Sequence, residues 1–341
     1  MSKILALTSG KNRKENIRKV LNLIKSDLPD FSKKSNILVK PNLTAVTHTY
    51  ANTAVEAIET VIEFLNENYA VKKITVADIS GTAYYKKVST WEALKNFGYD
   101  KLPQKYKNVV VETYEDAKDY IEIPIDTIVG KSRVRIVKKF QEFDYKFSVV
   151  PPKTHNFAIT TLGIKNMAGF VKSEDMALIH GMRAGKEVDA PKTILDRLPD
   201  GTVSRLRRKL PAWVMDAMFL AFPDFRRSIK HIHKNILAFS KVLWPDAVII
   251  DGLYGMEKDG PIDGIGIEHN MAIASADALK ADCACARAMG INPMDVGYLY
   301  YMAQEKMGES SLENIAGEKL ENIIKHYRLH GTYSAQRNWK K

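Results

Sequence analysis

One short stretch of the chain concentrates side chains that could bind and transform an anionic molecule. Residues 151–169 read PPKTHNFAITTLGIKNMAG and follow an apolar run, 147–150, that predicts a strand. The two prolines end strand pairing because proline has no backbone donor, so Lys153 and His155 emerge where the strand stops. In open α/β sheets, ligands bind at this carboxyl edge. A solvated loop with a helix cap explains any one of these residues, but explains their combination less well.

Three further predicted strands also end next to a charged side chain. They are 36–39 before Lys40, 74–77 before Asp78, and 247–250 before Asp251. Parallel strands bring their carboxyl ends to one edge of a sheet. We therefore expect Lys40, Asp78, Lys153, His155 and Asp251 to line one pocket.

The alternation of strand and helix patterns predicts that these strands are parallel. After an apolar run at 3–8, residues 12–28 keep helical spacing behind an Asn-x-x-Glu cap pattern, and a second helix pattern begins behind Thr53-x-x-Glu56. This order predicts an α/β fold with a mainly parallel sheet flanked by helices, as one large domain or two lobes. Between 109 and 150 the apolar runs lie close together, so some strands there are expected to be antiparallel.

Polar side chains mark two further predicted helices. Lys165 and Asn166 should begin or cap a helix that faces the pocket, with Gly163 and Gly169 allowing close approach of the backbone. Asp282 lies among alanines on a helix that is predicted to be buried. A carboxylate in that position needs a partner.

A glycine-rich segment, 251–266, could cradle a ligand or form a series of turns. It reads DGLYGMEKDGPIDGIG and contains five glycines and four acidic residues. Its spacing matches neither the dinucleotide-binding nor the P-loop motif. Gly252 is the glycine that follows the charged strand end, and we expect it to approach the ligand.

Composition indicates a large globular chain. Its 341 residues are 45% hydrophobic, enough for a sizeable core. No stretch approaches the ~18–20 apolar residues of a membrane span, and the N-terminus lacks a signal-peptide pattern, so we expect a cytoplasmic protein. Cys283 and Cys285 are the only cysteines. They exclude a disulfide framework and an iron–sulfur cluster held by four cysteines of one chain.

The net charge of +11 is concentrated in one region. Between residues 181 and 244, thirteen Lys or Arg stand against six Asp or Glu, and basic clusters flank the apolar run 210–222. We predict a basic, mostly helical insertion at 181–243 in an α/β core formed by 1–180 and 244–341. The apolar run suits a core helix with solvated flanks or a helix lying on an anionic membrane surface. Nucleic acid is an unlikely partner because no recognition motif is present.

Several motifs together resemble the DUF362 family of bacterial and archaeal proteins. VKPNLT, PPKTHNFAITTLGIKNMAGF and DGLYGMEKDGPIDG occur in the family's order, over about residues 36–180 and 244–315. The resemblance implies no reaction, because the family is named for having no assigned function. It implies that the shared polar positions are Lys40, Asn42, Asp78, Lys153, His155, Lys165, Asn166, His180 and Asp251.

The resemblance also bears on partners. Many relatives look like fusions to a two-cluster ferredoxin, whose cysteines this chain lacks, so an electron-transfer role would require a separate ferredoxin-like protein. Segment 181–243 looks like an insertion relative to the family pattern. A more distant similarity is to the nickel-pincer lactate racemases, which pair lysines and histidines in a cleft.

The leading hypothesis is an enzyme that binds a small anionic molecule. Catalysis is assigned to His155, His180 and Lys153, because histidine can take and give a proton near neutral pH. Binding is assigned to Lys40, Asn42, Lys165, Asn166 and Gly252. Asp78 and Asp251 would orient these groups or hold a divalent metal ion. Proton transfer next to a carbonyl, as in a racemase or lyase, fits this set, and hydrolysis and ligation remain open.

The rival hypothesis is a non-catalytic binding or redox-accessory protein. Such a protein would dock an anionic cofactor, a partner or a membrane surface through its basic face. The two hypotheses differ in what they require of His155 and His180, which must converge for acid/base chemistry.

Overall fold

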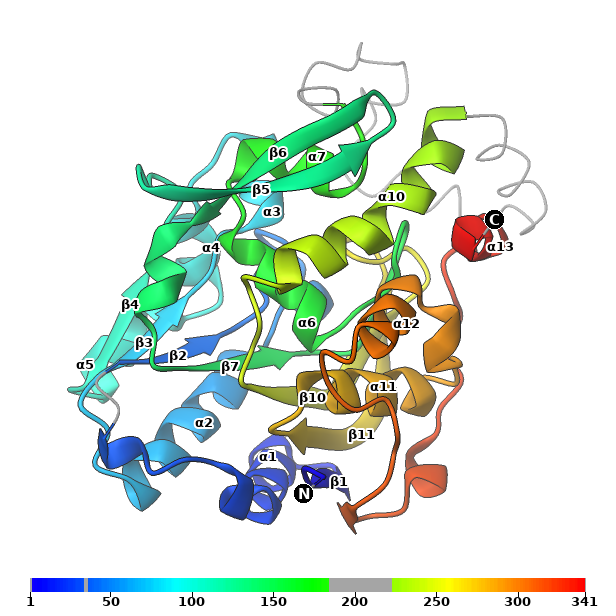
Figure 1. The fold of residues 1–341 in the computed structure, drawn as a ribbon. Coiled ribbons are helices and arrows are strands. Elements are labelled where there is room, and N and C mark those ends of the chain that lie inside the picture. The colour runs from blue at the N-terminus through cyan, green and yellow to red at the C-terminus, as the bar shows by residue number, and fades with distance from the viewer. Residues whose placement is uncertain (1, 34–35, 184–222, 341) are drawn as a thin grey trace.

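A computed structural model of the chain describes residues 2–33, 36–183 and 223–340. Its centre is a large sheet that crosses the molecule (Figure 1). The strands of this sheet are β1 (Leu5–Ser9), β2 (Ile37–Lys40), β3 (Ile74–Ala77), β4 (Val109–Glu112), β7 (Tyr145–Val150), β8 (Lys153–His155), β9 (Ile159–Thr161), β10 (Ala247–Glu257), β11 (Ile265–Ser275) and β12 (Ile315–Gly317). The main path runs β12-β1-β11-β10-β7-β2-β3-β4, and β8 and β9 extend it beside β10.

The sheet is mainly parallel, which confirms the predicted fold class. β10, β7, β2, β3 and β4 are parallel neighbours, whereas β11 runs antiparallel to both β10 and β1. The antiparallel pairing expected between 109 and 150 occurs in a separate hairpin of β5 (Tyr120–Thr127) and β6 (Gly130–Val137). The flanking strands β4 and β7 are parallel members of the main sheet.

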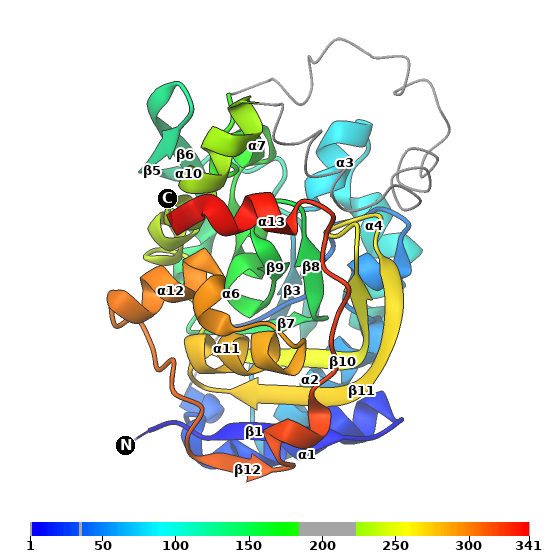
Figure 2. The ribbon, with the colours of Figure 1, turned by 90° about the vertical axis from the view of Figure 1, so that its right-hand side faces the viewer.

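Helices cover both faces of the sheet, as Figures 1 and 2 show. One face packs against α1 (Arg13–Leu23) and α2 (Val55–Asn68), and the other against α6 (Gly163–Asn166), α10 (Pro223–Ser240), α11 (Ala278–Ala288) and α12 (Gly297–Gln304). Alternate strand residues feed the two cores, since Val39 faces α1 and α2 while Leu38 faces the other layer. The shorter helices are α3 (Gly81–Lys86), α4 (Thr90–Asn96), α5 (Leu102–Lys105), α7 (Met176–Ile179) and α13 (Tyr333–Gln336).

The two predicted helix caps have different outcomes. Asn12 caps α1 as expected, because its side chain accepts the amide hydrogen of Glu15. Thr53 does not cap α2, whose N-cap is Ala54. The Thr53 hydroxyl instead accepts from the Asn42 amide at 2.8 Å and donates to the Val149 carbonyl at 2.8 Å. It thereby ties the loop after β2 to β7.

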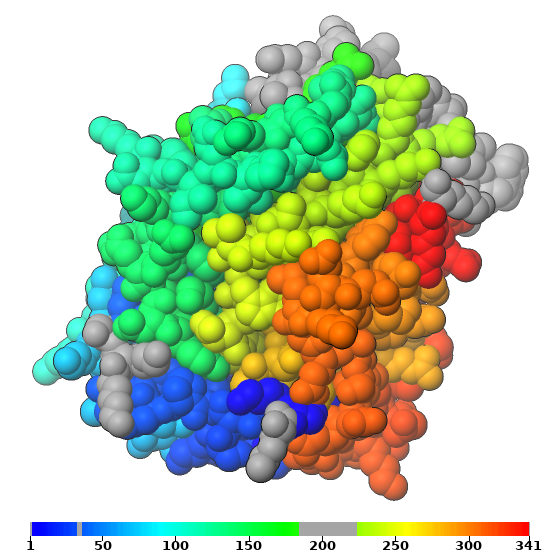
Figure 3. All heavy atoms as spheres, viewed as in Figure 1, coloured from blue at the N-terminus to red at the C-terminus, as the bar shows by residue number. Residues whose placement is uncertain are grey.

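Only part of the basic segment lies within the described residues. α10 buries Ile229, Ile232 and Ile236, and in Figure 3 it runs between the β5–β6 hairpin and α12. Its basic side chains at 226, 227, 230 and 234 are exposed. The basic cluster at 205–209 and the apolar run 210–222, with its predicted membrane-surface helix, lie outside the described residues. None of the helices that the structure describes has the length and apolar content needed to cross a membrane.

Residues 326–340, the C-terminal arm, run back over the edge of the sheet. In Figure 2 the arm, drawn in red, rises past the β8–β9 hairpin and ends in α13. Arg328 is fixed to the end of β10, because its backbone amide donates to Glu257 at 2.8 Å and its carbonyl accepts from Lys258 at 2.7 Å. These two hydrogen bonds fix the arm to the end of β10.

Candidate functional site

A cavity of about 180 Å³ lies beyond the ends of β2 and β3. An engineered cavity of roughly 150 Å³ in another protein accepts benzene, so this volume suits a small molecule. The polar lining includes Asn42, His155, Thr161, Lys165 and His180, and apolar walls come from Ile79, Phe157, Met176 and Ile262. The structure thus brings together most of the residues that the sequence singled out.

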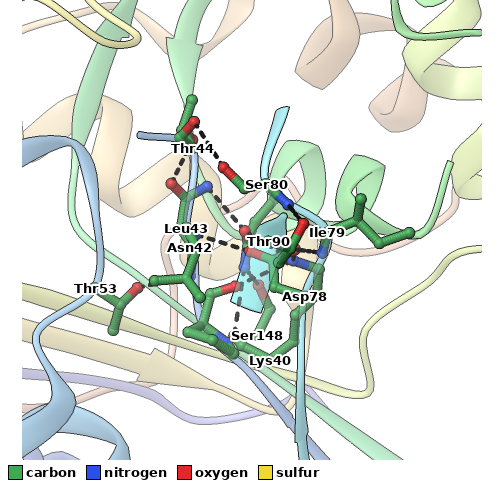
Figure 4. A network of polar contacts seen from close by, with 12 residues as sticks. Lys40, Asn42, Leu43, Thr44, Thr53, Asp78, Ile79, Ser80, Thr90 and Ser148 are labelled. Carbon is green, nitrogen blue, oxygen red and sulfur yellow. Dashed lines mark hydrogen bonds and ion pairs between the residues drawn. The ribbon is translucent and has the colours of Figure 1, made fainter. Parts of the chain in front are cut away.

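Lys40 and Asp78 form a buried ion pair beneath the cavity. The Lys40 ammonium donates to Asp78 Oδ1 at 2.5 Å, and both side chains are almost fully excluded from solvent. Asp78 also accepts from the backbone amides of Leu43 at 2.7 Å and Ile79 at 2.8 Å (Figure 4). Burial lowers the pKa of Lys40 and raises the pKa of Asp78, and the ion pair opposes both shifts. The Asp78 carboxylate therefore accepts hydrogen bonds from the Lys40 ammonium and from two backbone amides.

Lys153 is also buried, with an acceptor for each of its three ammonium hydrogens. These acceptors are Asn42 Oδ1 at 2.6 Å, Thr44 Oγ1 at 3.0 Å and the Ala51 carbonyl at 2.6 Å. Burial, and secondarily the charge of Lys165, lowers the pKa of Lys153 well below its ordinary value. Lys153 thus holds the loop after β2 in place from below the cavity.

Asn42 and Asn166 complete this network. Asn42 Nδ2 donates to Asn166 Oδ1 at 2.9 Å, and Asn166 Nδ2 donates to Ser148 Oγ at 3.0 Å. We define the partnered network as Lys40, Asn42, Asp78, Lys153 and Asn166. Because these groups already hydrogen-bond to one another, they form the floor of the cavity and support it.

Lys165 differs from the other two lysines. It lines the cavity, yet its ammonium makes no hydrogen bond or ion pair with any residue that the structure describes. Burial lowers the pKa of Lys165 to about 8. An ammonium in this setting gains most from an anion that enters the cavity.

The short helix that carries Lys165 is anchored by Asp282 of α11. The Asp282 carboxylate accepts from the amides of Gly163 at 2.8 Å and Ile164 at 2.9 Å, which supplies the partner that the sequence required. Burial raises the pKa of Asp282 to about 7. Since Asp282 occupies the start of α6, these two amides are not available to a ligand.

Two glycines permit the close contacts that were predicted. A Cβ atom at Gly163 would overlap Val248, and a Cβ atom at Gly169 would fall on Asp78 Oδ1 and 2.6 Å from the Lys40 ammonium. Gly169 therefore lets the chain after α6 pass directly over the buried ion pair.

His155 and His180 converge at the cavity. Their ring centroids are 5.6 Å apart and their planes differ by 14°. His155 Nδ1 accepts from the amides of Phe157 at 2.9 Å and Ala158 at 3.1 Å, so the neutral ring carries its proton on Nε2. Burial first, and Lys165 second, lowers the pKa of His155 well below its ordinary value. His155 is consequently a hydrogen-bond donor at neutral pH, whereas the sequence suggested a titrating acid or base.

His180 is less deeply buried and is oriented by its own helix. Its Nδ1 donates to the carbonyl of Met176 at 2.8 Å, one turn earlier at the end of α7. Phe157 packs against the ring edge at a centroid distance of 5.5 Å. These contacts hold the His180 ring against the cavity.

The turn between β8 and β9 is strained next to His155. Ile159 has φ 67°, an uncommon value for a β-branched residue, and the Thr160 amide donates to the Ala158 carbonyl at 2.7 Å across it. Such a backbone conformation costs about 1–3 kcal/mol and persists only where its surroundings enforce it. Just after this turn, the Thr161 hydroxyl is buried in the cavity lining without a hydrogen-bond partner among the described residues. Sequence reasoning did not single out Thr161, although it lies within 151–169.

Asp251 and Gly252 lie apart from the cavity. Asp251 lies two residues after Ile249 in β10 and therefore points to the same face of the sheet, toward α1. There Arg13 Nε donates to it at 2.8 Å. Lys40 lies two residues after Leu38 in β2 and therefore points to the other face of the sheet. Gly252 of β10 pairs with Met271 of β11, and a Cβ atom at Gly252 would lie 2.7 Å from the Met271 side chain. The expectation that strand ends alone would bring Asp251 into the pocket is therefore not met.

Asp78 and Asp251 consequently do not form a shared cation site. The oxygens of Asp78 serve Lys40 and two backbone amides, and Asp251 is paired with Arg13 on the other face. Within 2–33, 36–183 and 223–340, no cluster of three His, Cys, Asp or Glu side chains could hold a metal ion.

Comparison with known proteins shows the family of the chain and a similarity to a solved structure. The family model described as "Domain of unknown function (DUF362)" matches residues 37–287. Among solved structures, the chain is similar to the lactate racemase apoprotein from Thermoanaerobacterium thermosaccharolyticum, with 15% identity and a TM-score of 0.46. That match covers 84% of this chain and 57% of the racemase chain. No curated protein matches the sequence.

Proposed function

The chain belongs to the DUF362 family, and from the geometry of its cavity we propose that it is an enzyme that binds a small carboxylate and transfers a proton at the adjacent carbon. The observation that carries this proposal is Lys165. Its ammonium lines the cavity without a partner among the described residues. Every hydrogen of the nearby Lys153 ammonium, by contrast, has an acceptor.

The charges around the cavity favour an anion. Lys40 and Asp78 offset each other, so Lys153 and Lys165 leave the site cationic. The Thr161 hydroxyl and the His155 Nε2 hydrogen add two neutral donors on the same lining. An isolated buried charge is costly, and a ligand anion would offset that cost.

The donors suit a carboxylate better than a phosphate. No arginine is found among the described lining residues, although arginine is the usual bidentate partner of phosphate. The α6 amides, which resemble the phosphate sites at helix starts, already bind Asp282. The apolar part of the lining, from Ile79, Met176 and Ile262, suits a short hydrocarbon portion of the same ligand.

The two histidines suit proton transfer next to the bound carboxylate. Lys165 holds the carboxylate, and His155 donates its Nε2 hydrogen to the oxygen on which negative charge develops when the carbon loses its proton. His180, the less buried of the two rings, carries the proton. Each role uses a group that lines the cavity.

A non-catalytic binding protein is the second candidate. Lys165 could hold an anion without any reaction, and the low pKa of His155 favours a fixed donor over a proton carrier. The two candidates predict the same binding but differ in proton exchange with solvent.

Binding is tested with a panel of small carboxylates and inorganic phosphate by isothermal titration calorimetry. The proposal predicts that at least one short carboxylate binds, that Lys165→Met weakens this binding at least tenfold, and that phosphate binds less well. Lys241→Met is the matched control, because Lys241 forms a surface ion pair with Glu305 far from the cavity lining. Equal binding by both variants would contradict the role of Lys165.

Chemistry is tested by incubating the bound carboxylate in D2O and following deuterium at the adjacent carbon by NMR. The proposal predicts incorporation that His180→Gln and His155→Gln each reduce at least a hundredfold. Binding without incorporation would refute the enzyme and leave the binding protein.

A further inference from the structure

The C-terminal arm contacts the hairpin that carries His155 through one buried side chain. Gln336 has no solvent exposure, and its Nε2 donates to the His155 carbonyl at 3.0 Å. Its Oε1 accepts the Ile159 amide hydrogen at 2.6 Å. One carboxamide thus bridges the two ends of the strained turn, although Gln336 lies 181 residues from His155 in the chain.

A second residue of the arm extends this contact. Gln336 Nε2 also donates to Thr332 Oγ1 at 2.7 Å, and that hydroxyl donates to the Asn156 carbonyl at 3.0 Å. The arm therefore binds the backbone of residues 155, 156 and 159.

The same turn sets the orientation and tautomer of the His155 ring. The amides that donate to His155 Nδ1 belong to Phe157 and Ala158, which lie between the two points held by Gln336. Relaxation of the positive φ at Ile159 would move these amides away from the ring. The imidazole would then lose the contacts that place its proton on Nε2.

We propose that Gln336 is a positioning residue for His155, acting through the turn at 155–159 so that the imidazole presents its Nε2 hydrogen to the cavity. The arm then acts on the site through the hairpin, although none of its described residues lines the cavity. The proposal does not depend on which ligand binds, because the contacts are present in the free protein.

The test uses ¹⁵N NMR of the histidine rings and amide hydrogen exchange in the ligand-free chain. In the natural chain, His155 should show one tautomer with its hydrogen on Nε2, and the Ile159 amide should be protected. Gln336→Met, of similar size, should convert His155 to a mixture of tautomers and accelerate exchange at Ile159 at least tenfold. Gln336→Glu keeps an acceptor for Ile159 and should produce the smaller effect on exchange.

Trp339→Phe is the matched control. It removes another hydrogen bond of the arm, from the Trp339 ring to the Asp295 carbonyl at 2.9 Å, in which the hairpin takes no part. The proposal requires that this variant leave the His155 tautomer unchanged. An unaltered His155 spectrum in folded Gln336→Met, or the same change in Trp339→Phe, would overturn it. Because no ligand is added, the outcome is independent of the carboxylate assay.

Discussion

The floor and the wall of the cavity use the same residue type for opposite purposes. Lys40 and Lys153 in the floor have acceptors from side chains or backbone, and their charge is part of a closed network. Lys165 in the wall is also buried but has no partner among the described residues. Burial of a lysine therefore does not by itself indicate function. The acceptors around its ammonium distinguish a structural cation from one that is available to a ligand.

The largest expected effect comes from breaking the floor. Asp78→Asn leaves the buried Lys40 ammonium without its counter-charge, and removing one partner of a buried ion pair typically costs about 3–5 kcal/mol of unfolding free energy. Urea unfolding measures the loss. Adding Lys40→Met to Asp78→Asn should restore part of the stability, because the unpaired charge disappears.

Glu142→Gln is the control for charge removal, since Glu142 forms an exposed ion pair with Lys139. Its expected effect is below about 1 kcal/mol. If Asp78→Asn costs no more than this control, the floor is not a closed electrostatic network.

A second prediction concerns the chain that crosses the floor at Gly169. Gly169→Ala places a methyl group on Asp78 and Lys40, and such overpacking should lower the unfolding free energy by up to about 3 kcal/mol. Gly81→Ala is the matched control, because Gly81 also lines the cavity and a Cβ atom there would have no other atom within 4 Å. Thermal unfolding should separate the two variants by several degrees. Equal midpoints would show that the backbone above the ion pair can shift freely.

A third prediction concerns Lys165 in the cavity wall, where removal of the charge should stabilise the chain. Lys165 has a pKa of about 8 in the folded chain against 10.5 as its ordinary value. Between pH 8 and pH 10.5 the unfolded chain binds more protons at Lys165 than the folded chain does, so this residue makes the unfolding free energy rise with pH. Below pH 8 the free-energy cost of burying the ammonium is fully present. Lys165→Met should therefore stabilise the chain at pH 7 by about 1–2 kcal/mol, part of the full linkage value.

Unfolding midpoints at pH 7 and pH 10 test this prediction. When the pH is raised from 7 to 10, the difference between the unfolding midpoints of the natural chain and of Lys165→Met should shrink. Destabilisation of Lys165→Met at pH 7 would mean that the ammonium has a stabilising partner.

The sequence predicted the fold and the membership of the site better than it predicted roles. Strand and helix periodicity predicted the parallel sheet. The pattern of polar strand ends brought Asp78 and His155 to the cavity, with Lys40 and Lys153 beneath it, and the short-helix pattern brought Lys165. It failed for Asp251, because strands of a parallel sheet are apolar on both faces and their pattern does not reveal which face a terminal residue takes.

For two other residues, the sequence pattern was misleading or absent. The Thr53 pattern predicted a helix cap, but tertiary hydrogen bonds to Asn42 and Val149 claim its hydroxyl. Gln336 lies in the arm, far from any motif, and only the path of the chain brings it to His155. Contacts between residues so distant in sequence follow from topology, which periodicity does not encode.

The most direct test of the contrast between floor and wall is an NMR titration of the Lys165 side chain, with ¹³C-labelled lysine and the Lys165→Met spectrum for assignment. Lys165 should titrate with a pKa of about 8 in the free chain. A carboxylate that binds in the cavity should raise this pKa, because the anion stabilises the ammonium. An unshifted Lys165 that titrates like a surface lysine and does not respond to any carboxylate would contradict the account.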